Sequence, residues 1–385
     1  MAQDKNKTIP NVPPLRFPGF TDDWKRTPLN QMVERVTRKN TGEESNIALT
    51  ISAQYGLVDQ ESFFNNKVAS SDLSHYYLLY KGDYAYNKSY SSGYPWGAVK
   101  RLNMHEKGAV STLYICFHPF DTVDSDFIGH YFESSRWHKG VSEIAVEGAR
   151  NHGLLNIGVK DFFNTVHFIP SLPEQKKIAK LLTLIDERIN IQSKIIEDLK
   201  KLRAAIIDKE FNSMNGKMFL LEEVADIIKG KQINGEYLTD DGEYYVMNGG
   251  VEPSGYYHSF NALGNTISIS EGGNSCGYIQ WNNKPFWSGG HCYTLNIKDD
   301  FIENKYLYHF LKWREVDIMK LRIGSGLPNI QKKDLAKVPI IIPSNSAQKG
   351  LIDLADSIDG KIEIENTFLT LLHSQKGYLL SRLFI

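Results

Sequence analysis

The sequence predicts an α+β fold in which two related halves each combine a β-rich head with a long helix. Three observations support this prediction: an internal repeat, a helical pattern that closes each copy of the repeat, and turn-rich β patterns before each helix. With 385 residues, the chain exceeds the usual size of a single hydrophobic core. Two or more domains are therefore expected.

The repeat is clearest in the second part of each half. The pentapeptide GLLNI at 153–157 returns as GLPNI at 326–330, and this offset of 173 residues holds without a gap to the end of the sequence. The matching positions include Ile169-Pro170-Ser171 with Ile342-Pro343-Ser344, Lys160-Asp161 with Lys333-Asp334, Gln175 with Gln348, Ile185-Asp186 with Ile358-Asp359, and Phe211 with Phe384. An ungapped match of this length indicates a duplicated structural frame.

A weaker match opens each half, because residues 29–33 resemble residues 221–225 at an offset of 192. The first half therefore carries about nineteen extra residues between the two anchors. The middle segments, roughly 40–150 and 230–325, show no convincing similarity. Constant ends around divergent middles indicate a shared frame that carries two different recognition surfaces.

The end of each copy is predicted to be a long helix. Pro170 and Pro173 precede the first helix, Glu174 places negative charge at its start, and Gly216 is a natural stop. About 38 residues at 1.5 Å each would make a rod of roughly 57 Å. The apolar stripe comprises Ile178, Leu182, Ile185, Ile189, Ile196, Leu199 and Ile206, interrupted by Gln192 and Arg203. The second stripe comprises Leu351, Leu354, Ile358, Ile362, Leu369, Leu372, Leu379 and Leu383, with Gly350, Gly360 and Gly377 as weak points.

One apolar stripe on each of two rods favours their packing against each other as a coiled coil. The alternative is that each helix covers only its own globule. The resulting domain boundaries are 1–172 for the first head, 173–215 for the central helix, 216–343 for the second head and 344–385 for the C-terminal helix.

The middle segments are rich in strand and turn patterns. Residues 109–115 and 265–270 are expected to be strands, and residues 272–274 and 289–290 are expected to be turns. Short helices are expected between them, for example around residues 304–321.

Composition excludes several classes of protein. No apolar run approaches the roughly 20 residues needed to cross a bilayer, and residues 1–7 lack the apolar core of a secretory signal. Three cysteines are too few for a disulfide framework, so we expect a cytoplasmic protein that does not enter a membrane. The net charge of −1 means that any affinity for DNA must come from locally gathered Lys and Arg side chains.

The best local candidate for contact with nucleic acid is the segment 81–101, where basic and aromatic residues alternate. Lys and Arg can neutralise phosphates, Asn can pair with adenine, and aromatic rings can pack on bases or sugars. The candidates here are Lys81, Tyr86, Asn87, Lys88, Tyr90, Lys100 and Arg101. In the second half they are Lys229, Lys231, Lys284 and Arg322. The alternative reading is of core tyrosines and solvated lysines.

The sequence lacks the motifs of several enzymes. The stretch 11–15 has an intruding Val in what would be a methyltransferase motif, and no phosphate-binding loop of the Gly-x-x-x-x-Gly-Lys-Ser/Thr type is present. Neither Cys116 with His118 nor His291 with Cys292 has the spacing of a zinc site, and Glu303-Asn304-Lys305 lacks the upstream partner of a nuclease motif. No catalytic, cofactor-binding or metal-binding residue is therefore assigned.

Each half resembles half of a specificity subunit of a type I restriction-modification system. The resemblance rests on the opening 15–20 (LRFPGF) with Trp24, on Asn156-Ile157, and on the frame 169–175 (IPSLPEQ) followed by Ile178-Ala179 and Leu184-Ile185-Asp186. Lys81-Gly82-Asp83 and Pro285-Phe286-Trp287 are also similar to motifs of the family's recognition domains. The second copy departs from the frame, because Ser346-Ala347-Gln348 replaces Pro-Glu-Gln.

The resemblance implies a protein without catalytic activity that binds double-stranded DNA. Two target-recognition domains would each read half of a split site, and an antiparallel pair of helices would set their spacing. The implied partners are two modification subunits that methylate adenine with S-adenosylmethionine and two motor-endonuclease restriction subunits, in which ATP and Mg²⁺ would be bound. The alternatives are a coiled-coil scaffold whose two heads bind proteins, or a stand-alone nuclease or methyltransferase, which the missing motifs disfavour.

Overall fold

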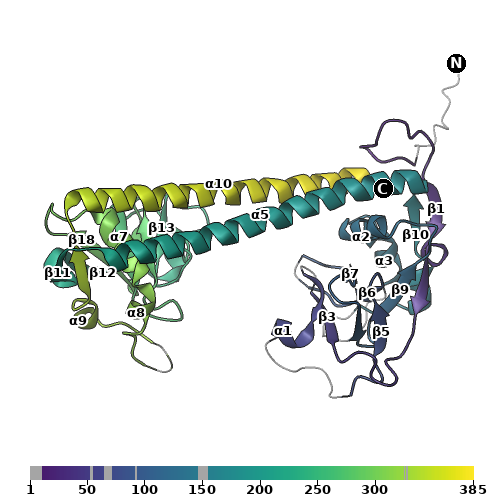
Figure 1. Cartoon of the computed structure of the whole chain (residues 1–385), viewed down its shortest axis with the longest axis horizontal. Helices are drawn as coiled ribbons and strands as arrows, with labels where there is room; N and C mark the ends of the chain where they lie inside the picture. The colour runs from purple at the N-terminus through teal and green to yellow at the C-terminus, as the bar shows by residue number, and fades with distance from the viewer. Residues whose placement is uncertain are drawn as a thin grey trace. The chain divides into compact units, whose positions relative to one another are not determined.

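A computed structural model of the chain describes residues 11–52, 55–64, 72–91, 93–145, 155–324, 326 and 328–385. Residues 1–7, for which a polar leader without a secretory signal is expected, lie outside this part. The chain forms two compact units: unit 1 comprises Met1–Gln192 and Phe368–Ile385, and unit 2 comprises Ser193–Thr367. Each unit is therefore discontinuous in sequence and takes segments from both long helices (Figure 1).

Within its described residues, unit 1 contains two four-stranded sheets and one two-stranded sheet. Their strand orders are β2-β9-β6-β7, β4-β3-β8-β5 and β1-β10. The strands are β1 Lys25–Pro28, β2 Val33–Val36, β3 Ala48–Ser52, β4 Gly56–Asp59, β5 Tyr77–Tyr80, β6 Tyr84–Asn87, β7 Ala98–Arg101, β8 Lys107–Val110, β9 Ile115–Pro119 and β10 Val166–Ile169. The shorter helices are η1 Leu29–Gln31, α1 Gln60–Phe64, α2 Ser125–Glu133, α3 His138–Ile144 and α4 Val159–Phe163.

The described part of unit 2 contains a four-stranded, a three-stranded and a two-stranded sheet. Their strand orders are β12-β18-β15-β16, β14-β13-β17 and β11-β19. The strands are β11 Lys217–Leu220, β12 Ala225–Lys229, β13 Tyr244–Met247, β14 Tyr256–Tyr257, β15 Thr266–Ser270, β16 Ile279–Asn282, β17 Trp287–Ser288, β18 Cys292–Ile297 and β19 Pro339–Ile342. The shorter helices are α6 Leu221–Val224, η2 Gly235–Tyr237, α7 Asn304–Trp313, α8 Glu315–Met319 and α9 Lys332–Leu335.

The repeat found in the sequence is present in the structure. In unit 1 the buried Leu29 follows β1, and its amide donates to the carbonyl of Thr165 at 2.9 Å. In unit 2 the buried Leu221 follows β11, and its amide donates to Val338 at the same distance. Leu29 and Leu221 are 192 residues apart, and Thr165 and Val338 are 173 residues apart. Both repeat offsets therefore connect residues at equivalent positions in the two units.

Two long helices, α5 Leu172–Ser213 and α10 Asn345–Leu383, contribute to both units. In unit 1 the start of α5 and the end of α10 share one core, in which Ile178 and Phe384 are buried. In unit 2 the end of α5 and the start of α10 share the other core, in which Phe211 and Leu351 are buried. Within each unit the helices thus run antiparallel, as Figure 1 shows for each pair.

The prediction of an α+β fold with an internal repeat and paired long helices is confirmed. Helix α10 runs through Gly350, Gly360 and Gly377 without a break, and a Cβ atom added at each of them would meet only open space. Among the described residues, no helix combines the length and the apolar composition that crossing a membrane would require.

One local prediction is wrong. Residues 109–115 were expected to form one strand, but Ser111 accepts from the amides of Leu113 and Tyr114 and turns the chain between β8 and β9. The short helices expected around residues 304–321 are present as α7 and α8, which meet at Arg314.

Candidate nucleic-acid interface

Several loops of unit 2 meet at one end of its four-stranded sheet. Strand β12 ends at Lys229, which pairs with Tyr293 near the start of β18. Strand β15 ends at Ser270, which pairs with Cys292. Because neighbouring strands are antiparallel, the loops after β12 and β15 and the loop before β18 must all lie at the same end of the sheet.

Backbone hydrogen bonds tie these loops to one another. The amide of Lys231 donates to Ser288 at 2.8 Å, and the amide of Gly273 donates to Pro328 at 3.0 Å. The approach is so close that a Cβ atom on Gly230 would lie 2.2 Å from the carbonyl oxygen of Gly289. Gly249 has φ +85°, and its Cβ would lie 2.8 Å from the oxygen of His291. Glycine is therefore required where the loops cross.

Basic side chains project from this loop cluster. Lys229 and His291 are 56% and 64% exposed, and between them lies the carboxylate of Glu271, only 11% exposed. The side chains of Lys231 and Arg322 are also exposed. The predicted candidates Lys229, Lys231 and Arg322 therefore lie around one end of one sheet, although almost a hundred residues separate the first from the last.

The corresponding sheet end of unit 1 carries three further candidates. In unit 1 Ala85 of β6 pairs with Cys116 of β9, and in unit 2 Ser268 of β15 pairs with Thr294 of β18, so Ala85 and Ser268 are equivalent. Lys88 and Glu271 each lie three residues further along their chains and therefore also occupy equivalent positions. The ammonium group of Lys88 donates to the carbonyl of Ile157 at 3.4 Å.

The other two candidates flank Lys88 at this end. Asn87 accepts from the amide of Ser89 at 3.1 Å, and the side chain of Tyr90 is 60% exposed. Asn87, Lys88 and Tyr90 therefore form a candidate surface equivalent to that of unit 2.

Lys81, Lys100 and Arg101 do not lie on this surface. Tyr84 pairs with Arg101 and Asn87 pairs with Ala98, which places Arg101 at the opposite end of β6 and β7. Lys81 is near that opposite end too and forms an exposed ion pair of 2.7 Å with Glu106. The segment 81–101 is thus divided between the two ends of a sheet.

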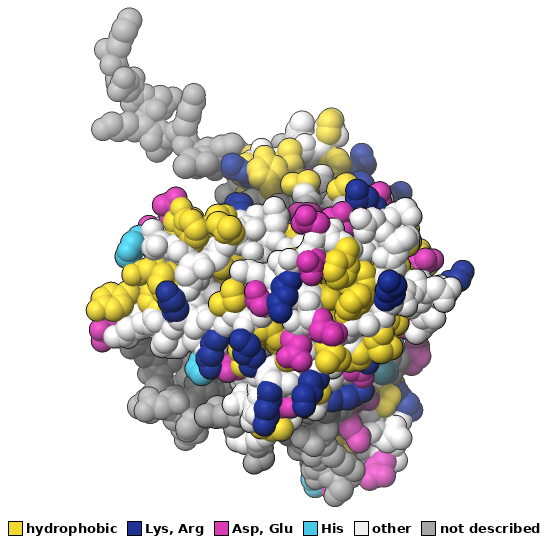
Figure 2. All heavy atoms as spheres, turned by 90° about the vertical axis from the view of Figure 1, so that its left-hand side faces the viewer, with side chains coloured by type: hydrophobic (Ala, Val, Ile, Leu, Met, Phe, Trp, Pro, Cys, Tyr) yellow, Lys and Arg dark blue, Asp and Glu magenta, His cyan; other side chains and the backbone are white. Residues whose placement is uncertain are grey.

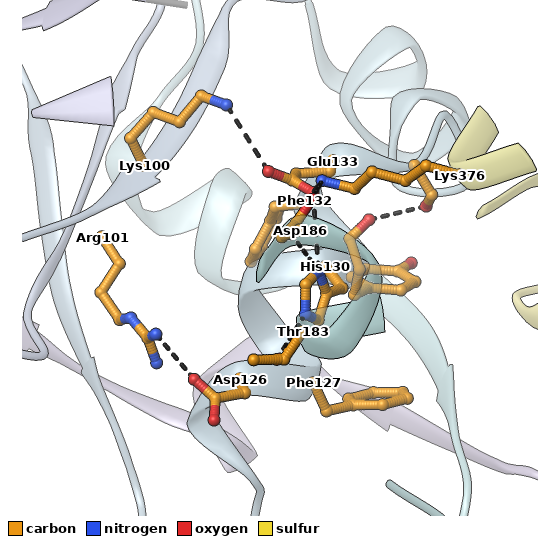
Figure 3. Close-up of polar contacts among 12 residues, drawn as sticks. Lys100, Arg101, Asp126, Phe127, His130, Phe132, Glu133, Thr183, Asp186 and Lys376 are labelled. Carbon is orange, nitrogen blue, oxygen red and sulfur yellow. Dashed lines mark hydrogen bonds and ion pairs between the residues drawn. The ribbon is translucent and has the colours of Figure 1, made fainter. Parts of the chain in front are cut away.

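The side chains of Lys100 and Arg101 are engaged inside unit 1 (Figure 3). Arg101 contacts Asp126 at 2.6 Å, and its side chain is 24% exposed. Lys100 lies 4.0 Å from Glu133 and is 17% exposed, and burial lowers its pKa. Neither side chain is directed to solvent in the manner of a phosphate contact.

Glu133 belongs to a cluster in which three side chains have the spacing of metal ligands: His130, Glu133 and Asp186. The ammonium group of Lys376 lies 2.7 Å from Glu133 and 2.6 Å from Asp186 (Figure 3). Burial would raise the pKa of Glu133, but His130 and the charges of Lys376 and Lys100 lower it to about 2. The carboxylates are thus neutralised by lysine from α10, and we interpret the cluster as a structural ion-pair network.

Two further candidates lie away from the loop clusters. Tyr86 is fully buried, with its ring stacked on Phe162 and its hydroxyl donating to the carbonyl of Trp96 at 2.8 Å. It cannot contact DNA in this structure, so the alternative reading of a core tyrosine applies to it. Lys284 is exposed but follows β16 at the far end of the sheet.

Sequence reasoning missed Glu271 and His291, which lie among the candidates of unit 2. An acidic residue directly before the Gly272-Gly273 turn was the available signal for Glu271. The Lys81-Gly82-Asp83 motif has a structural explanation instead. Asp83 is buried, accepts from the amide of Tyr80 at 2.8 Å, forms an ion pair with Arg38, and lies 2.7 Å from Nδ1 of His118.

The charge on one face of the molecule is mixed. On the face shown in Figure 2, Lys and Arg side chains are interspersed with Asp and Glu side chains and do not form one continuous basic field. This distribution agrees with the net charge of −1. Recognition of a nucleic acid would thus depend on a few side chains in loops.

Comparison with protein families gives one match. Residues 215–373 match the family described as the type I restriction modification DNA specificity domain. This range covers unit 2 from residue 215 onward, together with most of α10.

Several curated proteins are similar to parts of the chain. A protein named as a type I specificity subunit from Mycoplasma genitalium is 33% identical over 154 residues, 40% of either chain. A similarly named protein from Mycoplasma pneumoniae is 34% identical over 151 residues, 39% of this chain and 40% of the relative. A type I restriction enzyme specificity subunit from Methanocaldococcus jannaschii is 24% identical over 253 residues, 55% of this chain and 60% of the relative. The chain thus matches about 40% of the length of the two mycoplasma relatives.

Two solved structures share the fold over nearly the whole chain. The S subunit of a type I restriction-modification system from M. genitalium superposes with a TM-score of 0.61 at 20% identity, covering 97% of this chain and 99% of that one. A chain from a study of complex assembly and conformational transition of a type I system gives 0.59 at 16% identity, covering 94% and 97%. At these identities the comparison establishes the fold.

Proposed function

We propose that this chain, which matches the type I restriction modification DNA specificity domain over residues 215–373, is a specificity protein that selects the DNA site for a type I restriction-modification system and is not itself catalytic. Each unit would read one half of a split site in double-stranded DNA. The single observation that carries this proposal is the pair of equivalent sheet ends, which share a frame and differ in chemistry. Lys88 in unit 1 stands where unit 2 has Glu271.

The proposed contacts are made by the loops at these ends. Exposed Lys and Arg side chains would neutralise phosphates, while amide and ring side chains would reach base edges. In unit 1 the contacts are assigned to Asn87, Lys88 and Tyr90, and in unit 2 to Lys229, Lys231, His291 and Arg322. Tyr86, Lys81, Lys100, Arg101 and Lys284 are not part of this proposal.

The paired helices would set the spacing between the two half-sites. Helix α5 has 42 residues and α10 has 39, and each contributes to both units without a break. A helix has a fixed rise per residue, so its length limits which two segments of a duplex both heads can reach. Base pairs between the half-sites would then matter only through their deformability.

The same helices would dock the partner subunits. Exposed apolar side chains recur at equivalent positions, with Ile191 matching Ile364 and Ile195 matching Phe368 at the repeat offset of 173. Their exposed fractions are 60%, 64%, 40% and 38%, respectively. A surface that occurs twice suits two copies of one partner.

We assign the remaining functions of the system to those partners. Two modification subunits would use S-adenosylmethionine to methylate adenine, and two restriction subunits would use ATP and Mg²⁺. This chain would bind none of these cofactors. The site of action is expected to be the cytoplasm.

The first prediction concerns the independence of the two heads. Cells that co-express the full chain with a modification subunit should carry methylated adenine in a split motif, read by sequencing that detects the modified base. Exchanging residues 40–150 for those of another specificity subunit should change only one half of that motif, because the second reader is untouched.

Two outcomes would contradict the proposal. A change in both halves would exclude independent readers. Binding of the purified chain to protein, with no salt-dependent affinity for DNA, would favour the scaffold alternative.

A further inference from the structure

Glu271 is an acidic residue placed where a DNA-binding surface would gain nothing from negative charge. Its side chain is 11% exposed and lies beneath two exposed basic residues, Lys229 and His291. A carboxylate near phosphates weakens binding unless it is paired and performs a positioning task. Its contacts indicate what that task is.

The carboxylate of Glu271 is held by a buried tyrosine and faces two exposed basic side chains. Its Oε1 accepts from the hydroxyl of Tyr293 at 2.9 Å and from the ammonium group of Lys229 at 2.7 Å. Its Oε2 lies 3.8 Å from Nδ1 of His291. Tyr293 is buried in the core of unit 2, so it anchors the carboxylate while the two basic groups remain solvent-accessible.

The backbone of Glu271 connects the loops that carry these groups. Its amide donates to His291 at 2.9 Å, and its carbonyl accepts from Ile330 at 2.8 Å and from the thiol of Cys276 at 3.0 Å. Residue 271 is therefore the point at which the end of β12, the start of β18 and the segment 328–330 meet.

We propose that Glu271 is a positioning residue of the second reading head, which holds Lys229 and His291 in the arrangement that selects the bases of the second half-site. This inference rests on the proposed function. Lysine alone is a flexible point charge with little sequence preference, and a fixed partner restricts where its charge can lie. In unit 1 the equivalent Lys88 is tied to Ile157 instead, so the two heads position their charges differently.

The test uses Glu271→Gln, which keeps the shape of the side chain and can still accept from Tyr293 but removes the negative charge. In cells that express the full chain with a modification subunit, methylation mapping should show a relaxed second half-site and an unchanged first half-site. Discrimination against single mismatches in the second half should fall roughly ten-fold or more. Affinity of the purified chain for a duplex without the motif should not fall, because a repulsive charge is lost.

Asp226→Asn is the matched control. Asp226 lies on the same strand as Lys229 and forms an ion pair of 3.4 Å with Lys298, away from the loop cluster. This change removes one negative charge from the same unit and should leave both half-sites unchanged. Glu271→Asp, which restores the charge, should recover part of the lost discrimination.

The remaining outcomes are decisive. An unchanged second half-site in the Gln variant would overturn the positioning role, as would loss of both halves together, which would indicate a contribution to folding alone. Higher affinity for every sequence with the same discrimination would reduce Glu271 to a repulsive charge. If the wild-type chain directs no sequence-specific methylation, the proposed function itself fails.

Discussion

At the scale of single residues, a buried histidine links two elements of unit 1. The hydroxyl of Thr165 donates to the carbonyl of Phe162 at 2.7 Å, so its oxygen accepts from Nε2 of His167 at 2.8 Å. Nδ1 of His167 is then the acceptor for the hydroxyl of Tyr131, also at 2.8 Å. This chain of bonds requires the neutral imidazole, and burial lowers the pKa of His167 to about 4.

Unit 1 should therefore lose stability in mild acid. Below pH 6.5, the ordinary pKa of histidine, the unfolded state binds a proton that the folded state refuses until about pH 4. The contribution is complete above pH 6.5 and falls by about 3 kcal/mol as the pH drops to 4. Hydrogen exchange of the peptides containing α2 and β10, corrected for intrinsic rates, measures this loss.

His167→Asn is the control for this prediction, because its amide oxygen can accept from Tyr131 and it does not titrate. The variant should be less stable than the wild type at pH 7, and the difference should shrink by pH 4.5. A constant difference across that range would show that another group causes the acid sensitivity.

The tyrosines of unit 1 show why residue roles were only partly predictable. Tyr86 and Tyr90 both lie in a segment of alternating aromatic and basic residues, and the sequence pattern does not separate them. In the structure Tyr86 lies in β6 and is buried, whereas Tyr90 lies beyond the strand and is exposed. The difference arises from a second layer, α3 and α4, whose position against β6 depends on contacts between segments far apart in sequence.

At the scale of elements, the repeated frame was predictable because the sequence contains two copies of it. Gln175 accepts from the amide of Asp124 at the start of α2, and its own amide donates to Pro170. Gln348 accepts from the amide of Glu303 at the start of α7 and donates to Pro343. The repeated glutamine thus fixes a long helix to the start of the helix that packs on it, which explains why it is retained where Pro-Glu is lost.

The interruption of the apolar stripe by Arg203 also has an explanation. Arg203 forms a two-point ion pair with Asp359 in unit 2, with Nη2 to Oδ2 at 2.7 Å. The residues 173 positions away are Lys376 and Asp186, which pair at 2.6 Å in unit 1. Each unit therefore holds its two helix segments together with one equivalent ion pair.

We expect a coupling free energy of about 1 kcal/mol between Arg203 and Asp359, because both side chains are partly exposed. A double-mutant cycle with Arg203→Met and Asp359→Asn, followed by hydrogen exchange of α7 and α10 in unit 2, measures it. Arg203→Lys should retain part of the coupling, since lysine occupies the equivalent position in unit 1. A coupling near zero would mean that the helices are held by apolar contacts alone.

At the scale of the whole molecule, the reading loops were the least predictable part. The pairing of β12 and β18 brings Lys229 and His291 to one end of a sheet, and the bridges of Asn329 to Gly272 and Ile323 bring the segment of Arg322 there. No local pattern encodes these contacts. The long helices were the most predictable part, because their periodicity and capping residues are local. The sequence therefore predicted the long helices more fully than the loops that are proposed to contact DNA.

The spacer leads to the last prediction. Deleting residues 193–196 from α5 together with the repeat-equivalent residues 366–369 from α10 removes one turn and a fraction from both helices and keeps their antiparallel register. Four residues correspond to about 6 Å of helix, or about two base pairs of duplex at roughly 3.4 Å each. Methylation mapping should then show a target whose spacer is shorter by about two base pairs and whose half-sites are unchanged. The deletion brings Leu199 and Leu372 into the places of Ile195 and Phe368, so an apolar side chain stays at each proposed docking position. Replacing the other six deleted residues by alanine, with Ile195 and Phe368 kept, preserves the length and should leave the spacer as it was. Deletion from α5 alone should disrupt the helix pairing and abolish methylation. Altered half-site bases at the original spacing would show that the helices do not measure the distance between the readers.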